Sequence, residues 1–336
     1  MASSVPDTFR AYEFEQFGDA LEVVKLNSTA QQQQLQPSMV RLRVHSAGLN
    51  PADYKVVEFG KSFLTTQPSP EHPFRLGFDV AGTVVEVGAD VQGFQVGDAV
   101  YGRAPFAGIG TFAEYFDVDA KSVAAKPTKL SFTKAGGVAA VALTSYQALT
   151  DHAKLQAGER VLILGGSSGT GLLGVQLAKL LGASTVIATT SKRNFELVTS
   201  MGADRVIDYT TEKWGDVIEP HSVDIVYDCG VDPQAWNTDA QKVLKKTTGR
   251  FASLDDTKEP IESVFGATLL PWVRSQPSGA TLEKIAPFFN SEKLVVPIDS
   301  VHKFENLKEA MKAQKSGHAR GKIILQVIKD EGEDED

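Results

Sequence analysis

The chain contains one cysteine, Cys229, among its 336 residues. A single thiol excludes an intrachain disulfide, a thiolate-rich zinc site and a paired-cysteine redox motif. The chain also lacks a run of about 20 apolar residues, so we expect no membrane-spanning helix. Its first ten residues have neither the apolar core of a signal peptide nor the Arg-rich pattern of a transit segment. These absences predict a cytoplasmic protein in a reducing compartment.

Outside the C-terminus the positive and negative charges nearly balance. The net charge is −8, and residues 330–336 contain six acids, so the rest of the chain carries only −2. A nearly neutral body offers no electrostatic case for binding nucleic acid. We expect the acidic tail to be a solvated end without a catalytic role.

The remaining composition is that of an ordinary soluble protein, with 42% hydrophobic and 23% charged residues. At roughly 150 residues per domain, the length predicts two domains. Residues 10–130 consist of short alternating runs broken by Gly, Pro and Asp, which is typical of β-strands. The Gln-rich segment 29–37, which contains Gln31 to Gln34, is predicted to be a loop between two strands.

The pattern changes after residue 130. An Ala-rich segment, 134–149, predicts a helix, and strands then alternate with helices. The predicted strands are 160–164, 185–189, 205–208, 225–227 and 250–253, and the helices between them include 172–181 and 193–201. Such alternation indicates an α/β fold with a doubly wound parallel sheet. The C-terminal part predicts helix 281–290, strand 293–298, helix 307–316 and strand 322–328.

A glycine-rich run, Gly-Gly-Ser-Ser-Gly-Thr-Gly at 165–171, lies directly between a predicted buried strand and a helix. Backbone N–H groups at such a helix start bind a pyrophosphate, assisted by the helix dipole. In the GxGxxG register the three positions are Gly166, Ser168 and Gly171. Ser168 replaces the glycine that permits the closest backbone approach, although its hydroxyl could donate to a phosphate. The alternative is a tight strand-to-helix turn without a ligand.

The end of the second strand indicates which nicotinamide cofactor binds. A site for NAD has an Asp or Glu there to bind the ribose hydroxyls. Residues 189–194 contain no acid, but they include Ser191, Lys192, Arg193 and Asn194. Hydroxyls, cations and an amide suit the 2′-phosphate of NADPH. The alternative for Lys192 and Arg193 is two solvated surface cations.

Seven motifs together carry a resemblance to a known family. They are Ala-Gly-Leu-Asn-Pro-Ala-Asp-Tyr (47–54), Gly-Phe-Asp-Val-Ala-Gly (77–82), Gly-Asp-Ala-Val-Tyr-Gly (97–102), Gly-Thr-Phe-Ala-Glu-Tyr (110–115), Ala-Leu-Thr-Ser-Tyr (142–146), the pair Met-Gly-Ala-Asp (201–204) and Asp-Tyr (208–209), and Gly-His-Ala-Arg-Gly-Lys (317–322). With the glycine turn, their order and spacing resemble the medium-chain dehydrogenase/reductase superfamily, and within it the zinc-less, zeta-crystallin-like quinone oxidoreductases. Departures are the Gln-rich insertion, Ser168 and the acidic tail.

The resemblance implies a two-domain fold. Residues 1–137 and 279–336 would form a GroES-like, β-rich catalytic domain, and residues 138–278 a Rossmann domain that binds NADPH. The active site would lie in the cleft between them.

The resemblance also bears on zinc. Zinc-dependent relatives have a Cys near the position of Asn50 and a His-Glu pair where this chain has Phe78 and Asp79. The six histidines are scattered without ligand spacing. We therefore expect no metal.

Site residues follow from the resemblance. It places Asn50 and Tyr54 near the nicotinamide and the substrate. Asn50 would donate a hydrogen bond to the substrate carbonyl, and Tyr54 would donate a hydrogen bond or a proton, or only line the pocket. Lys55 and water are alternative proton sources, and Trp272 would help to shape the acceptor pocket. The predicted cofactor contacts are Asn50, Thr144, Gly166, Ser168, Gly169, Thr170, Ser191, Lys192, Asn194, Tyr209, Cys229, Leu254, Arg320 and Lys322. Among them, Cys229 is expected to be a small buried residue and no nucleophile.

The functional hypothesis is NADPH-dependent reduction of quinones or α,β-unsaturated carbonyls by hydride transfer without a metal. Two alternatives stay open. One is an enoyl-thioester reductase, and the other a non-catalytic NADPH-binding or RNA-associated protein of the crystallin kind. We expect a homodimer or homotetramer with a small-molecule substrate, and neither membrane nor nucleic acid as a partner.

Overall fold

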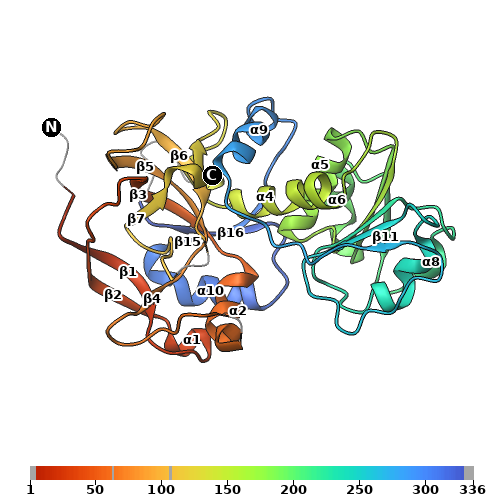
Figure 1. Ribbon diagram of the computed structural model, residues 1–336, viewed down its shortest axis with the longest axis horizontal. Helices are drawn as coiled ribbons and strands as arrows, with labels where there is room; N and C mark the ends of the chain where they lie inside the picture. The colour runs from red at the N-terminus through yellow and green to blue at the C-terminus, as the bar shows by residue number, and fades with distance from the viewer. Residues whose placement is uncertain (1–4, 63, 106–107, 329–336) are drawn as a thin grey trace. The chain divides into compact units, whose positions relative to one another are not determined.

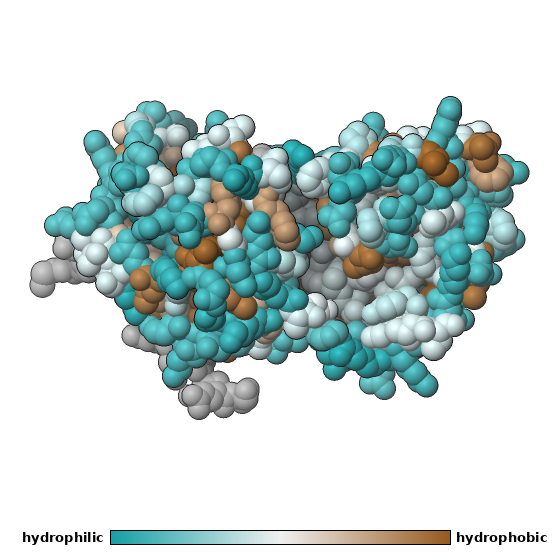
Figure 2. Space-filling view, turned by 90° about the horizontal axis from the view of Figure 1, so that it is seen from below, coloured by the Kyte–Doolittle hydropathy of each residue, from teal (hydrophilic) through white to brown (hydrophobic). Residues whose placement is uncertain are grey.

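The computed structural model describes residues 5–62, 64–105 and 108–328, so the acidic tail at 330–336 and the first four residues lie outside it. The described chain forms two compact units. Unit 1 comprises the chain up to Ala140 together with 277–292 and the segment from Pro297 onward. Unit 2 comprises 141–276 and 293–296. On the face seen in Figure 2, hydrophilic residues predominate and hydrophobic ones lie in small separate groups.

Unit 1 contains two sheets among its described residues. A three-stranded sheet has the order β2 (Lys25–Gln31), β1 (Thr8–Phe14), β4 (Phe74–Arg75). A seven-stranded sheet has the order β15 (Ile298–Lys303), β16 (Lys322–Gln326), β3 (Met39–Gly48), β5 (Asp79–Val87), β6 (Ala99–Arg103), β8 (Val123–Ala125), and β7 (Tyr115–Asp119) also pairs with β3. The Gln-rich segment 29–37 forms the loop to β3 only from residue 32 onward; the expected loop is wrong for residues 29–31, which end β2.

The helices of unit 1 cover its sheets. They are α1 (Ala20–Val23), α2 (Pro51–Phe59), α3 (Phe132–Ala135), α9 (Gly279–Asn290) and α10 (Leu307–Lys315), with short 3-10 turns at Gly60–Ser62, Ala120–Ser122 and Phe304–Asn306. Helices α2 and α10 pack against each other, and α10 also covers β15 and β16 (Figure 1). Apolar side chains with almost no exposure fill the space between them, among them Leu49, Val57, Leu307 and Ile323.

Unit 2 is built on a six-stranded parallel sheet in the described chain. Its order is β11 (Arg205–Asp208), β10 (Thr185–Thr190), β9 (Arg160–Leu164), β12 (Ile225–Asp228), β13 (Arg250–Ser253), β14 (Thr268–Leu269). Its helices include most of α4 (Ala139–Gln147), then α5 (Gly169–Leu180), α6 (Phe195–Ser200), α7 (Trp214–Val217) and α8 (Gln241–Val243), with π-turns at Ala148–His152 and Trp236–Ala240. Helix α5 packs on β9 and β10, and α6 on β10 and β11 (Figure 1).

The strand order of this sheet reverses direction at β9. From β9 the chain proceeds outward through β10 to β11, and it then returns to place β12 on the other side of β9. At such a reversal the loops at the carboxyl ends of the two central strands diverge and leave a crevice. The predicted doubly wound α/β architecture is confirmed.

The expected helix 134–149 is wrong as one continuous element. Helix α3 ends at Ala135 and α4 begins at Ala139, with Gly136 and Gly137 between them. A Cβ at Gly136 would lie 2.1 Å from Ser46 Oγ, and one at Gly137 would lie 2.4 Å from Ile324 Cδ1. Close approach of the backbone to β3 and β16 interrupts the helix, which an Ala-rich pattern does not reveal.

The expected strand at 293–298 is also wrong. The strand of this region, β15, begins only at Ile298. Before it, the backbone of Val295 is bound by a side chain: its N–H donates to Gln176 Oε1 (2.8 Å), and its carbonyl accepts from Gln176 Nε2 (3.0 Å). The buried side-chain amide of Gln176 on α5 therefore makes the two backbone hydrogen bonds that a neighbouring strand would otherwise make.

No helix in the described part of the chain has both the length and the apolar character needed to cross a membrane.

Candidate active site

The glycine turn of unit 2 links β9 to α5 and leaves no room for side chains at its tightest points. Gly165 has φ of +81°. A Cβ at Gly166 would lie 2.8 Å from the Cβ of Ala188, and one at Gly171 would lie 2.2 Å from the carbonyl oxygen of Gly165. A backbone packed this closely can approach a pyrophosphate as a side-chain-bearing turn cannot.

Ser168 has a different role from the expected one. It is the N-cap of α5, and its Oγ accepts a hydrogen bond from the Gly171 N–H (3.0 Å). The same hydroxyl donates to the Gly165 carbonyl (2.8 Å), so its hydrogen is used within the turn and not held for a phosphate. In the described chain, the N–H groups of Gly169 and Thr170 find no acceptor, and they are the donors that the turn offers to an anion.

Beyond β10, polar side chains surround the place expected for the 2′-phosphate. Asn194 is buried and its Nδ2 lies 3.4 Å from both Thr190 Oγ1 and Ser191 Oγ. Thr190 Oγ1 in turn donates to Ser167 Oγ (2.8 Å). The side chain of Lys192 is exposed, as a cation that receives a phosphate must be.

The sequence contains no acid at the end of β10, but the fold brings one from the next strand. Asp208 ends β11 and lies directly opposite Thr190. Its Oδ1 accepts from the N–H (3.0 Å) and the hydroxyl (2.6 Å) of Thr210. These bonds, with the backbone N–H and the charge of Lys192, lower the pKa of Asp208. The motifs included Asp208, but its place opposite Thr190 was not predicted, because only the pairing of the parallel strands reveals it.

The other unit 2 candidates lie after the carboxyl ends of strands or on α4. Tyr209 follows β11 and is 61% exposed, as a residue bordering an adenosine must be. Cys229 and Leu254 follow β12 and β13, and their N–H groups donate to Leu164 and Asp228. Cys229 is half-buried and not fully buried as expected, but desolvation still raises the pKa of its thiol, so the sulfur stays protonated and is a poor nucleophile. Thr144 on α4 forms a hydrogen bond with Ser275 (2.9 Å).

In unit 1, three predicted or quoted residues meet in a buried ring. The Lys322 ammonium donates to Asn50 Oδ1 (2.6 Å) and to Asp79 Oδ2 (3.1 Å), and Asn50 Nδ2 donates to the same Asp79 oxygen (3.0 Å). The Leu49 carbonyl accepts the third ammonium contact (2.8 Å). The Asn50 amide also donates to the Gly48 carbonyl (3.2 Å), so both its ends are engaged inside the protein. This geometry differs from the expected donor to a substrate carbonyl.

Two further titratable groups, to which the sequence analysis gave no role, adjoin the ring. Asp53, in the first turn of α2, accepts from the Asn50 N–H (2.6 Å). Burial raises the pKa of Asp53 to about 8, although the Asn50 bond and the charges of Lys322 and Arg103 oppose this. Burial also lowers the pKa of Arg103 at the end of β6. An acid three residues after an N-cap Asn is a capping signal that could have revealed Asp53, whereas no local signal points to Arg103.

The remaining unit 1 candidates are not part of this ring. Tyr54 lies next to Asp53 on α2 and is half-buried. The Lys315 ammonium lies 5.7 Å from the centre of the aromatic side chain of Tyr54. Lys55 is exposed. Arg320 is also exposed, and its backbone N–H donates to Asp299 (2.8 Å). Among the described residues, no cluster of three His, Cys, Asp or Glu side chains could hold a metal.

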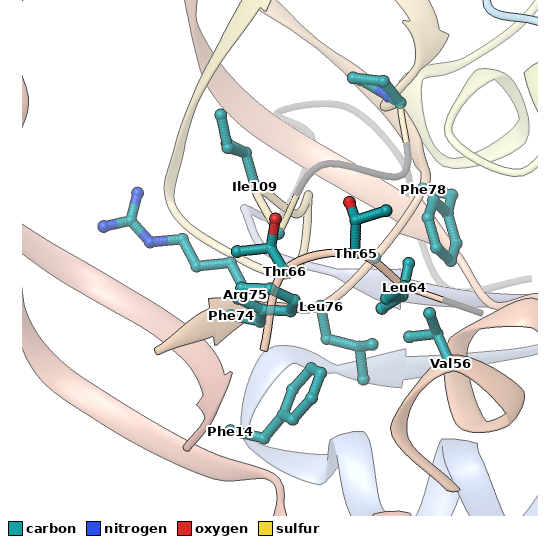
Figure 3. A pocket seen from close by; sticks show the side chains of 13 residues that line it. Phe14, Val56, Leu64, Thr65, Thr66, Phe74, Arg75, Leu76, Phe78 and Ile109 are labelled. Atoms are coloured by element: carbon teal, nitrogen blue, oxygen red, sulfur yellow. The ribbon is translucent and has the colours of Figure 1, made fainter. Parts of the chain in front are cut away.

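Unit 1 also contains a cavity of about 290 Å³ (Figure 3). It is lined mainly by Phe14, Val56, Leu64, Phe74, Leu76, Phe78, Pro105 and Ile109, with Thr65 and Thr66 as hydroxyl groups. The Arg75 guanidinium points away from it in Figure 3, and its Nε donates to Glu13 (2.9 Å). Val56 and Phe78 connect the cavity to the ring in sequence, because Val56 lies on α2 and Phe78 directly precedes Asp79.

Comparison with known proteins identifies the family. Residues 36–128 match the alcohol dehydrogenase GroES-like domain and residues 201–325 the zinc-binding dehydrogenase domain. The 2-methylene-furan-3-one reductase of Solanum lycopersicum is 34% identical over 97% of this chain and 81% of its own. The NADPH-dependent alkenal/one oxidoreductase, chloroplastic, of Arabidopsis thaliana is 33% identical over the same shares. The structure of the Coxiella burnetii quinone oxidoreductase superposes with a TM-score of 0.81 at 30% identity, covering 95% of this chain and 99% of that one.

The chain therefore belongs to the medium-chain dehydrogenase/reductase superfamily, among its quinone and enone oxidoreductases, as the motifs predicted.

Proposed function

We propose that this protein is an NADPH-dependent reductase of quinones or α,β-unsaturated carbonyls that works without zinc. The observation that carries the proposal is the fit of unit 2 to the cofactor. Its glycine turn presents the amides of Gly169 and Thr170, and the end of β10 presents an exposed Lys192. The names of the tomato, Arabidopsis and Coxiella relatives support the same chemistry.

Unit 2 would hold the cofactor with its own groups. Gly169 and Thr170 would bind the pyrophosphate, while Ser191, Lys192 and Asn194 would bind the 2′-phosphate. Tyr209 would border the adenosine, and Thr144, Cys229 and Leu254 would line the carboxyl edge of the sheet. The chemistry that NADPH supplies when bound is hydride donation.

Unit 1 would hold the acceptor. A cavity of about 290 Å³ whose side chains are mostly aromatic or aliphatic could hold a small, flat acceptor. Tyr54 is the proposed donor of a hydrogen bond or proton to the acceptor oxygen. The hydrogen-bonded ring supports a function without zinc, because the Lys322 ammonium occupies the position among three oxygens where a metal ion would otherwise be held.

Cofactor choice tests the proposal. NADPH should bind at least about tenfold more tightly than NADH, because a charge-assisted contact to the 2′-phosphate contributes about 1.5–3 kcal/mol. Lys192→Ala should weaken NADPH and leave NADH nearly unchanged, as measured by fluorescence titration. Lys308→Ala, which removes an exposed lysine of unit 1, is the matched control. Equal dissociation constants for both cofactors would refute the 2′-phosphate site.

Turnover with a panel of acceptors separates the alternatives. A quinone and an enone should oxidise NADPH, whereas a faster reaction with an enoyl thioester would favour a thioester reductase. Binding of NADPH without turnover of any acceptor would favour the non-catalytic reading. We also propose a cytoplasmic homodimer or homotetramer of the zeta-crystallin branch, on the single cysteine and the family resemblance. Fractionation and light scattering test these two points.

A further inference from the structure

The sequence analysis predicted two charged residues of unit 1, Arg320 and Lys322, to contact the cofactor. Arg320 is exposed, whereas Lys322 is buried. It is only 3% exposed, and its partner Asp79 is fully buried. An ammonium has three hydrogens, and three protein oxygens lie 2.6–3.1 Å from this one: Asn50 Oδ1, the Leu49 carbonyl and Asp79 Oδ2. Its donor capacity is used within unit 1.

The polar atoms of Asp79 and Asn50 are also hydrogen-bonded within unit 1. The second oxygen of Asp79 accepts from the Ala140 N–H (2.5 Å), and the Asn50 amide donates to Asp79 and Gly48. Three carbonyl or carboxylate oxygens around one point form the kind of surroundings that a hard cation prefers. Here a side chain from β16 fills that point, 272 residues away from Asn50 in sequence.

The ring also fixes the start of one helix. Asn50 is the N-cap of α2, and Asp53 in its first turn binds the Asn50 N–H. The same helix carries Tyr54, the proposed donor, and Val56, which lines the cavity. Loss of the ammonium would remove one of the two positive charges beside the buried Asp79, the other being Arg103, and would free the Asn50 amide at the start of the helix.

We propose that Lys322 is a built-in cation and a positioning residue, which fixes α2 and the acceptor side of the site, and that it is not a contact of the cofactor. The inference rests on the proposed function for its catalytic consequence only. The occupancy of the cation position can be tested on the protein without cofactor or acceptor.

The first test uses Lys322→Met, which keeps most of the side-chain length and removes the charge. We expect the NADPH dissociation constant to stay within about twofold, while kcat/KM for the acceptor falls at least about tenfold. Lys308→Met, an exposed lysine of the same unit, should change neither quantity. A folded Lys322→Met protein that binds NADPH ten times more weakly and keeps its acceptor kinetics would overturn the proposal in favour of a cofactor contact.

The second test covers variants that fold poorly. If Lys322 compensates Asp79, Lys322→Met should lower the melting temperature, and the double variant Lys322→Met/Asp79→Asn should recover much of it. The double variant then serves for the NADPH titration. Additive losses in the double variant would argue against a charge-compensating ring.

The third test asks whether the position binds a free cation. Lys322→Ala removes the equivalent of a propylammonium ion, so propylammonium chloride should raise the melting temperature of the cofactor-free variant. The same salt should leave wild type and Lys308→Ala unchanged, and tetramethylammonium should have no effect because it has no N–H donor. Equal effects of both salts on all three proteins would contradict a specific cation position. A wild type that reduces no acceptor would refute the proposed function, while this stabilisation would still support the cation position.

Discussion

Asp53 is a carboxyl group that the fold keeps from water. One of its oxygens accepts from the Asn50 N–H, and the other has no hydrogen-bond partner in the described chain. Burial outweighs the nearby positive charges and raises its pKa to about 8. At neutral pH the native protein therefore holds a proton at this site that the unfolded chain releases.

This difference predicts a pH-dependent stability. Because the folded pKa is above the unfolded value of 3.8, the contribution of Asp53 is fully favourable below pH 4 and is lost as pH rises toward 8. Asp53→Asn imitates the protonated form, so from pH 5 to pH 8 it should gain more than about 1 kcal/mol relative to wild type. Urea unfolding at both pH values measures this. Asp216→Asn neutralises an exposed carboxylate and serves as the control for net charge; an Asp53→Asn difference that is constant with pH would contradict the prediction.

At the scale of elements, helix α5 depends on a cap that also shapes the cofactor turn. The Ser168 hydroxyl binds the Gly171 N–H at the helix start and the Gly165 carbonyl in the turn. One side chain thus satisfies two backbone groups and joins the turn to the helix. The position that departs from the family pattern is occupied by a residue with a structural role.

Ser168→Ala should therefore cost stability more than cofactor affinity. We expect a loss of about 1 kcal/mol in the free energy of unfolding, the usual cost of removing an N-cap. The NADPH dissociation constant should rise only a few-fold, since the amides of Gly169 and Thr170 remain. Ser200→Ala, at an exposed serine on α6, is the control. A loss of NADPH affinity of about a hundredfold with unchanged stability would instead indicate a direct phosphate contact.

At the scale of the whole molecule, the question is whether the chain carries a metal. The matched family model is described as a zinc-binding dehydrogenase. In this chain Asn50 and Asp79 stand where the resemblance expects metal ligands, and they bind an ammonium instead. A cation already in place opposes a second one at the same point.

The purified protein should therefore contain no stoichiometric zinc, as measured by elemental analysis. Exhaustive dialysis against a chelator should leave both reductase activity and melting temperature unchanged. One tightly held zinc per chain, with activity lost on its removal, would contradict the zinc-less reading. Readdition of zinc to the dialysed protein controls for damage during dialysis.

Local sequence determined much of this protein. The apolar run 160–164 followed by glycines predicted β9 and the turn, and the ordered motifs predicted the family and its α/β fold. These features depend on nearest neighbours: glycine conformations, strand periodicity and helix starts are local properties. The helix break at Gly136 and Gly137 was not predictable in this way, because its cause is contact with β3 and β16.

Within each unit, tertiary structure alone decided which groups surround the charged candidate residues. Lys322, Asn50 and Asp79 come from three distant segments, and Asp208 reaches Thr190 only through the pairing of β10 and β11. Burial raises the pKa of Asp53, so that it keeps its proton at neutral pH, and the surrounding oxygens accept the hydrogens of the Lys322 ammonium. Desolvation and hydrogen-bond capacity depend on every group packed around an atom. The sequence alone therefore does not tell which groups these side chains bind.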